Sequence, residues 1–324
     1  MSNSFESFLQ QHDDTDWLQV LFKLEPNIHP VDQRATRIWF SFFPLKLKRA
    51  FDAAPDRQKF ETDFILKGQY LLTEQVDEAA HFLYGHRYWP QVKQAVVSYA
   101  ETANATAPLY EQITAVANQL AAQVKAPVSL LIGITAVAFM TLEHVGLEKM
   151  QYAAVTTIRH PATAPEQVLA ERNRDDSQGL FGFLRTVDKR FSVTFNENVE
   201  EAKFPVVNMQ DITMAAAEDK RPHHLNEPRC KEGEGPLPVE CRTCACGTCW
   251  VGVLSDPSKL SPPALREIDK ASTVFCYDGF TGERDSPIRM ACQVKCFGNV
   301  SIVIPPWHGV LRKLKNQSQA AKSE

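Results

Sequence analysis

The segment Glu240–Val253, "ECRTCACGTCWVGV", contains four of the eight cysteines of this chain. Three of them, Cys241, Cys246 and Cys249, follow the spacing C-x4-C-x2-C. A further thiol, far along the chain, is available at Cys292. Thiolates are the ligands that soft metal ions prefer, and a short loop can bring several of them to one place. The segment therefore predicts a metal centre that one loop builds together with one distant cysteine.

This spacing is that of plant-type 2Fe-2S proteins, in which a distant fourth cysteine completes the ligand set. Three stretches of the chain resemble a plant-type or related bacterial 2Fe-2S ferredoxin domain, namely "CRTCACGTCWVGVL", "LSPPALRE" and "RMACQVKCFGNVSIVIP". The resemblance covers about residues 189–306 and does not extend to the first 170 residues. It implies a β-grasp fold, with three cysteines on one loop and the fourth just before the last strand.

The resemblance also implies a ligand set for the cluster. Cys241 and Cys246 would bind one iron, and Cys249 and Cys292 would bind the other. Cys244 stands where the family usually has glycine, so the loop either takes another conformation or carries strain. Cys244 is also an alternative ligand, because the two C-x2-C pairs of the loop could form a zinc site. The single residue between these pairs, and the ferredoxin-like flanks, favour the iron cluster.

The other cysteines have no metal partner assigned by their spacing. Cys296 could form a disulfide with Cys244 or serve with it as a reserve ligand, but two buried free thiols are the more ordinary state. Cys230 and Cys276 are interpreted as structural cysteines. The predicted cofactor-binding residues are therefore four cysteines of the second half of the chain, and no catalytic residue is predicted.

Composition indicates an ordinary globular protein. The chain has 324 residues, of which 44% are hydrophobic and 23% charged, so two domains are expected. The formal net charge of −4 gives no basic footprint for nucleic acid. The N-terminal sequence lacks the features of a secretory signal, which favours a cytoplasmic location. In such a reducing compartment, clustered cysteines are more often metal ligands than disulfides.

The periodicity of apolar residues changes between the two halves of the chain. From Asp14 to about Met150 they recur at helical spacing, and prolines divide the region into segments of helix length. Beyond a polar stretch at 161–179, Phe191, Val193 and Phe195 alternate with polar residues, as in a half-buried strand. The predicted class is α+β, with a mainly helical N-terminal domain and a C-terminal β-grasp ferredoxin-like domain.

Domain bounds and element ends follow from the same patterns. We expect a helical docking domain over 1–175, a ferredoxin-like domain over 180–310 and a polar basic tail over 311–324. Within the second domain, Asn208 and Ser261 are expected to cap two short helices. These assignments place all the predicted chemistry in the C-terminal domain.

The helical region raises two further questions. Residues 126–142, "APVSLLIGITAVAFMTL", are uncharged and reach the lower limit for a membrane-spanning helix, but a helix buried inside the domain is the favoured interpretation. The aromatic residues and histidines of this half, including those around Trp39 and Trp89, are expected to pack in the core. Any of these aromatics that reached the surface would instead anchor a partner.

A cluster with four protein ligands has no open position for a substrate, so its chemistry is one-electron transfer. The sequence has no Gly-rich dinucleotide fingerprint, and a complete reductase is not expected. The chain is predicted to be no enzyme by itself, but an electron-transfer subunit that relays single electrons within or to a larger oxidoreductase complex. Such a complex would provide any contact with a membrane. A redox-sensing regulatory protein is the alternative function, and a structural zinc protein is the less favoured one.

Overall fold

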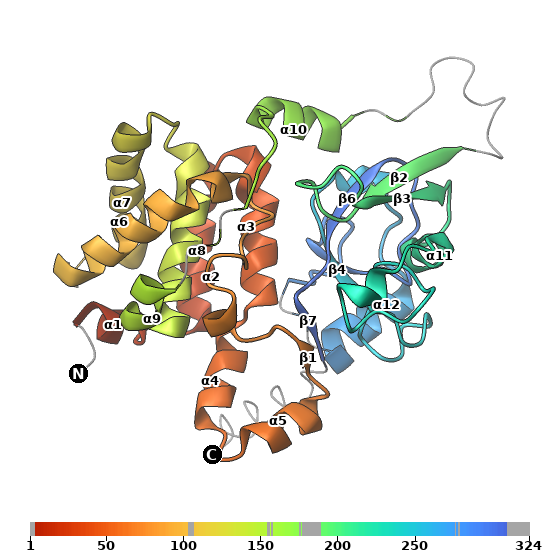
Figure 1. Ribbon diagram of the computed structural model, residues 1–324, viewed down its shortest axis with the longest axis horizontal. Helices are drawn as coiled ribbons and strands as arrows, with labels where there is room; N and C mark the ends of the chain where they lie inside the picture. The colour runs from red at the N-terminus through yellow and green to blue at the C-terminus, as the bar shows by residue number, and fades with distance from the viewer. Residues whose placement is uncertain are drawn as a thin grey trace. The chain divides into compact units, whose positions relative to one another are not determined.

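The computed structural model describes residues 4–102, 107–153, 156, 158–174, 176, 189–275, 277 and 279–309. The chain divides into two compact units. The helical unit comprises Met1–Asp52 and Leu71–Pro165, and the sheet unit comprises Ala53–Tyr70 and Glu166–Glu324. Figure 1 shows the helices of the first unit in red to yellow-green, and the sheet of the second mostly in green to blue. The predicted tail, 311–324, lies outside the described residues.

The helical unit consists of α-helices joined by short loops and 3-10 turns. The helix α2 (Asp14–Leu24) illustrates how they begin: the side chain of Asp13 accepts hydrogen bonds from the backbone N–H groups of Thr15 and Asp16, and Asp16 returns the contact as a capping box. The other helices are α1 (Ser4–Leu9), α3 (Pro30–Phe42), α4 (Leu45–Ala53), α6 (Trp89–Thr102), α7 (Leu109–Val124), α8 (Ser129–Val145) and α9 (Leu147–Tyr152).

The centre of the helical unit is α8. Every residue from Leu130 to Glu143 is buried, and α8 contacts α3, α6 and α7. Gly133 permits the close approach of α3, because a Cβ atom there would lie 2.6 Å from Oγ1 of Thr36. A helix that is apolar on all sides is buried on all sides, as the sequence predicted for this stretch. None of the helices in the described part of the chain has the length and apolarity needed to span a membrane.

The sheet unit contains a mixed sheet of five strands. The strands β2 (Arg190–Thr194), β3 (Lys203–Val207), β4 (Trp250–Val253), β5 (Ile288–Met290) and β6 (Val300–Val303) lie in the order β3-β2-β6-β4-β5. β2 and β6 run parallel at the centre, and the other neighbours are antiparallel. This mixed sheet beside a helical N-terminal unit confirms the predicted α+β class. The first and last strands of the five, β2 and β6, are adjacent and parallel.

Short helices complete the sheet unit: α5 (Arg57–Phe64), α10 (Pro165–Arg172), α11 (Ile212–Glu218) and α12 (Leu265–Asp269), which continues into a π-helical turn, η7 (Lys270–Phe275). The two predicted helix caps are wrong. Asp211, not Asn208, caps α11 by accepting a hydrogen bond from the N–H of Met214. Ser261 lies four residues before α12, and its hydroxyl instead accepts a hydrogen bond from the N–H of Lys295.

A second, two-stranded sheet joins distant parts of the sequence. The strand β1 (Lys67–Gly68) pairs antiparallel with β7 (Trp307–His308). The N–H of Gln69 extends this ladder with a hydrogen bond to the carbonyl of Pro306. Residues 53–70 therefore belong to the sheet unit, although the chain before and after them belongs to the helical unit.

Candidate functional site

The cysteine loop, residues 240–249, has no regular secondary structure and leads directly into β4. Its backbone turns through left-handed conformations at Arg242 (φ 54°), Cys244 (φ 58°) and Gly247 (φ 77°). Left-handed geometry costs a non-glycine residue free energy. The backbone is therefore strained at Arg242 and Cys244. The turns direct the N–H groups of Thr243 and Ala245 to Sγ of Cys241, at 3.4 and 3.2 Å.

The thiols of the predicted ligands fall into two groups. Cys241 and Cys246 are half-buried, and each thiol affects the acidity of the other. Cys249 is buried and affects the acidity of Cys292, which lies just beyond β5 and is also buried. Cys244, fully buried, contacts the same Cys292 thiol. The loop and the end of β5 thus bring together all four predicted ligands and the predicted alternative.

Hydrogen bonds shift the acidity of these thiols. The contacts from Cys244 and Cys249 lower the pKa of Cys292 to about 3, because they stabilise its thiolate. Burial alone would raise the pKa of Cys241, but its backbone N–H donors and Cys246 reverse that effect and lower it to about 7. Each group of thiols therefore contains one cysteine that is readily available as thiolate, the form that binds a metal.

Backbone pairing holds Cys249 and Cys292 together. β4 pairs with β5 so that Trp250 lies opposite Met290, and the N–H of Ala291 donates to the carbonyl of Cys249 at 2.9 Å. The side-chain amide of Gln293 lies 3.4 Å from Sγ of Cys292. Two sequence-distant cysteines are thus fixed by the ladder of the main sheet.

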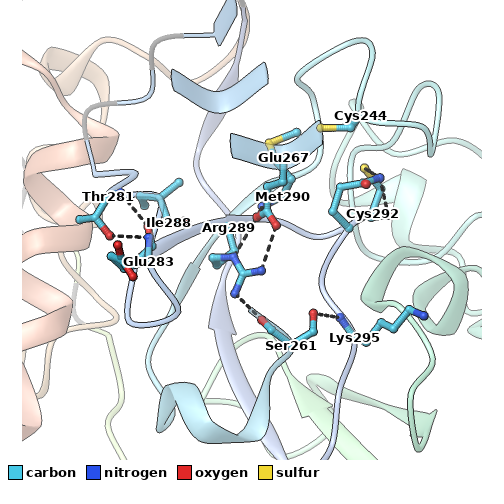
Figure 2. A network of polar contacts seen from close by, with 12 residues as sticks. Cys244, Ser261, Glu267, Thr281, Glu283, Ile288, Arg289, Met290, Cys292 and Lys295 are labelled. Atoms are coloured by element: carbon cyan, nitrogen blue, oxygen red, sulfur yellow. Dashed lines mark hydrogen bonds and ion pairs between the residues drawn. The ribbon is translucent and has the colours of Figure 1, made fainter. Parts of the chain in front are cut away.

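A fully buried ion pair supports the Cys292 end of the site. Nε and Nη2 of Arg289 donate to the two carboxylate oxygens of Glu267 at 2.8 and 2.9 Å, and neither side chain is exposed. The same carboxylate accepts from the N–H of Met290 at 2.8 Å, and the remaining guanidinium nitrogen donates to the carbonyl of Ser261. Figure 2 shows this network beside Cys244 and Cys292. Because the charges are fully paired, α12 is fixed to β5 two residues before Cys292.

Aromatic side chains cover the loop from another side. The ring of Tyr277 stacks on Trp250 at a centroid distance of 4.7 Å, and its hydroxyl donates to the carbonyl of Gly247. Burial raises the pKa of Tyr277, so this hydroxyl stays a neutral donor. Gly247 is required here, since a Cβ would lie 2.7 Å from the ring of Phe275. These contacts limit the access of water to the buried thiols.

The grouping of the thiols bears on which metal centre these residues could hold. Within the described ranges, no three His, Cys, Asp or Glu side chains converge as ligands of one metal ion. A 2Fe-2S cluster needs two separate pairs of thiolates, and the contacts Cys241–Cys246 and Cys249–Cys292 provide two pairs. A zinc site from the two C-x2-C pairs would instead need Cys244 grouped with Cys241 and Cys246, whereas Cys244 contacts Cys292.

The remaining cysteines do not join these groups. Cys230 and Cys296 are buried free thiols, and burial raises the pKa of each to about 12. The disulfide considered between Cys244 and Cys296 is not formed, since both are free cysteines. Such high pKa values make Cys230 and Cys296 poor ligands and poor nucleophiles. Cys276 lies outside the described residues.

In the helical unit, His86 and Asp77 belong to one internally paired network. His86 is buried, stacks on Trp89 and contacts the carbonyl of Asp77 through Nε2 and the ring of His160 through Nδ1. The carboxylate of Asp77 in turn accepts from Lys93 at 2.9 Å. These contacts agree with the packing role predicted for the histidines. Of the six aromatic residues considered as surface anchors, all except Tyr88 are buried: Trp39, Phe42, Phe43, Tyr84 and Trp89.

Sequence reasoning missed the supports of the site. Arg289 could have been suspected from one signal, because "IRM" reads as a buried strand that contains a charge. A buried guanidinium needs an acidic partner, but several acids between Glu267 and Arg289 lie closer in the sequence, so the sequence does not identify Glu267 as that partner. The pairing of β1 with β7 gives no such signal, since neither two-residue strand has a recognisable pattern.

No match to this chain is found among protein-family models, curated proteins or solved structures. The interpretation of the cysteine loop therefore depends on its own residues. The resemblance of its motifs to ferredoxins and the grouping of its thiols are the two observations that bear on function.

Proposed function

We propose that the chain is an electron-transfer protein that carries one 2Fe-2S cluster and serves as a subunit of a larger redox complex. The observation that carries this proposal is the grouping of thiols: Cys241 with Cys246 within the loop, and Cys249 and Cys244 with Cys292 at the end of β5. The two groups correspond to the two irons of the cluster. The proposed ligands are Cys241, Cys246, Cys249 and Cys292.

The cluster, when bound, would supply a site that accepts and returns one electron. The protein's own residues would set how easily it does so. N–H groups directed at Cys241 stabilise negative charge on sulfur, which favours the reduced state. The aromatic cover of Tyr277 and Trp250 limits water and raises the cost of extra negative charge. These opposing effects determine the reduction potential.

The helical unit would bind the donor or acceptor protein. On α2, Leu18 and Phe22 lie four residues apart on one face of the helix and are 65% and 78% exposed. Apolar side chains so exposed are typical anchors of a protein interface. They replace the aromatic anchors considered from the sequence, all of which except Tyr88 are buried. We place the protein in the cytoplasm, with membrane contact only through a partner, and assign it no nucleic acid.

A spectroscopic titration tests the redox proposal. The full-length protein, purified without oxygen, should absorb visible light, lose much of that absorption with dithionite, and regain it in air. The reduced form should give the electron paramagnetic resonance signal of a single unpaired electron. A colourless protein, after reconstitution with iron and sulfide, would contradict the proposal.

A binding experiment tests the docking role. Phe22→Ser should leave the visible spectrum unchanged and reduce co-purification of the oxidoreductase partner. The exposed Leu265, 87% exposed and in the sheet unit, provides a matched control as Leu265→Ser. Equal co-purification by wild type and Phe22→Ser would remove the docking role of this face.

A further inference from the structure

Residues 53–70, here called the clamp segment, leave the helical unit after Asp52 and return to it at Leu71. Between these points the segment forms α5 and β1 and packs in the sheet unit. Phe64 and Leu66 are buried there, and a Cβ on Gly309 would lie 2.4 Å from Cδ2 of Leu66. The segment is therefore a closely packed part of the unit that contains the cysteine loop.

The first contact of the clamp segment is the β1–β7 pairing. Gly68 has a φ of 95°, and a Cβ on it would lie 2.4 Å from the carbonyl oxygen of Pro306 and 2.9 Å from Cδ of Arg229. No side chain fits at this position without displacing the backbone of one strand. The glycine thus permits the close approach of β1 to β7.

The second contact reaches the start of the cysteine loop. Nζ of Lys67 lies 3.7 Å from the carboxylate of Glu240, the residue before Cys241. The N–H of Glu240 donates to Oγ1 of Thr248, which lies 3.2 Å from Sγ of Cys246. One residue of the clamp segment is thereby linked, through Glu240 and Thr248, to both cysteines of the first thiol pair.

The third contact reaches the end of the loop through β7. The ring of Trp307, which lies opposite Gly68 in the β1–β7 sheet, packs edge-on against Trp250 at a centroid distance of 5.4 Å. Trp250 directly follows Cys249, and both tryptophans are buried. The β1–β7 sheet therefore contacts residues that flank both ends of the loop.

We propose that the clamp segment is a positioning element of the metal centre: β1 contacts the start of the cysteine loop directly and its end through β7, so that residues 53–70 help determine cluster retention and reduction potential. This inference deepens the proposed function and rests on it. It assigns Lys67 and Gly68 a role that their place in the N-terminal half of the sequence does not suggest. Lys67 also places a positive charge 3.7 Å from the carboxylate of Glu240, the residue before Cys241, and a positive charge on this side of the loop favours the reduced cluster.

Two variants of the full-length protein test the mechanical contact. Gly68→Ala should separate β1 from β7, so the N–H of Gln69 should exchange its hydrogen faster with solvent, and cluster loss to an iron chelator should accelerate several-fold. Lys59→Met, an exposed position on α5 of the same segment, is the control and should behave as wild type. Faster exchange in Gly68→Ala with an unchanged rate of cluster loss would overturn the proposal.

Opposite charge changes test the electrostatic contact and remain informative if Gly68→Ala fails to fold. Lys67→Met should shift the reduction potential to more negative values, and Glu240→Gln should shift it to more positive values. A purely structural contact would shift the reduction potential of both variants in the same direction, and that result would also overturn the proposal.

If wild type itself binds no iron and sulfide, the proposed function fails. If wild type binds the cluster but the variants match it, only the positioning role fails.

Discussion

Each of the two units contains a buried ion pair, and the two pairs support different structures. In the helical unit, Lys93 donates to Asp77 at 2.9 Å, and the same carboxylate accepts from the indole of Trp89. In the sheet unit, Arg289 donates to Glu267 through two nitrogens. Both pairs are desolvated, so their net contribution to stability is small compared with the cost of breaking either one.

The two pairs differ in the other groups that each carboxylate contacts besides its Lys or Arg partner. Asp77 binds Thr156 N–H and lies beside His86, within a core of helices. Glu267 binds the N–H of Met290, two residues before a predicted ligand. A buried ion pair alone therefore does not indicate a functional site. The groups that it positions do, and in this chain those groups are thiols only in the sheet unit.

The largest expected effect is loss of the cluster when a predicted ligand in the sheet unit is changed. Changing any predicted ligand to serine, as in Cys292→Ser, should remove or severely perturb the visible absorption, because one iron loses a thiolate. Cys296→Ser, four residues away, should keep it, since that buried thiol has a pKa of about 12 and lies in neither thiol group. A cluster that tolerates Cys292→Ser but not Cys296→Ser would show that the ligand assignment is wrong.

The next effect compares the two ion pairs directly. Glu267→Gln leaves the guanidinium of Arg289 buried without a countercharge, which should cost about 3–5 kcal/mol in the free energy of unfolding. Asp77→Asn should destabilise the helical unit for the same reason. Denaturant titration measures both losses, and visible absorption measures cluster retention at low denaturant. Only Glu267→Gln should accelerate cluster loss, so equal loss in both variants would remove the distinction between the pairs.

A smaller effect is expected on the pH dependence of the free energy of unfolding. Burial lowers the pKa of His86 from 6.5 to about 4, so the unfolded chain takes up a proton first as the pH falls. Stability from neutral His86 is complete above pH ~6.5 and declines toward pH ~4, by about 1.4 kcal/mol per unit at most. Glu143, whose pKa burial raises to about 7, acts in the opposite direction. Between pH 7 and pH 5, the free energy of unfolding should fall less, or rise more, for His86→Gln than for wild type, and an identical change in both would contradict the assignment.

The smallest expected effect is at Cys244. Cys244→Ser should retain the cluster, because the two thiol pairs are complete without it. Cys244→Gly should relieve the left-handed strain at φ 58°, a gain of about 1 kcal/mol that the loss of a buried thiol offsets. Visible spectra and thermal unfolding of the two variants check this. If Cys244→Ser bleaches the protein while Cys246→Ser does not, the ligand spacing is shifted and Cys244 is the ligand.

The sequence predicted those features that local patterns determine. Alternation at Phe191 and Val193 predicted β2, and apolar residues on all sides of 126–142 predicted the buried α8. The spacing of the cysteines predicted a loop that gathers thiols. Cys244 in a glycine position predicted either strain or an altered loop, and the structure shows the left-handed backbone.

Features that depend on residues far apart in the sequence could not be predicted. β1 and β7 are two residues each and about 240 residues apart, so no periodicity identifies them. The cap of α11 was misplaced by three residues because Asn208 and Asp211 are both good caps, and tertiary pairing of Asp211 with Lys295 decides between them. Likewise, the sequence does not show which carboxylate pairs with the buried Arg289. Only the packing of α12 against β5 identifies Glu267.

The metal and sulfide content of the full-length protein, purified without oxygen, tests the central claim most directly. The account predicts about two iron atoms and two acid-labile sulfides per chain. Cys292→Ser in the same preparation should lower both values together, and Cys296→Ser should leave both unchanged. One zinc ion per chain without sulfide would contradict the account, because it would show that the cysteine loop forms a mononuclear structural site.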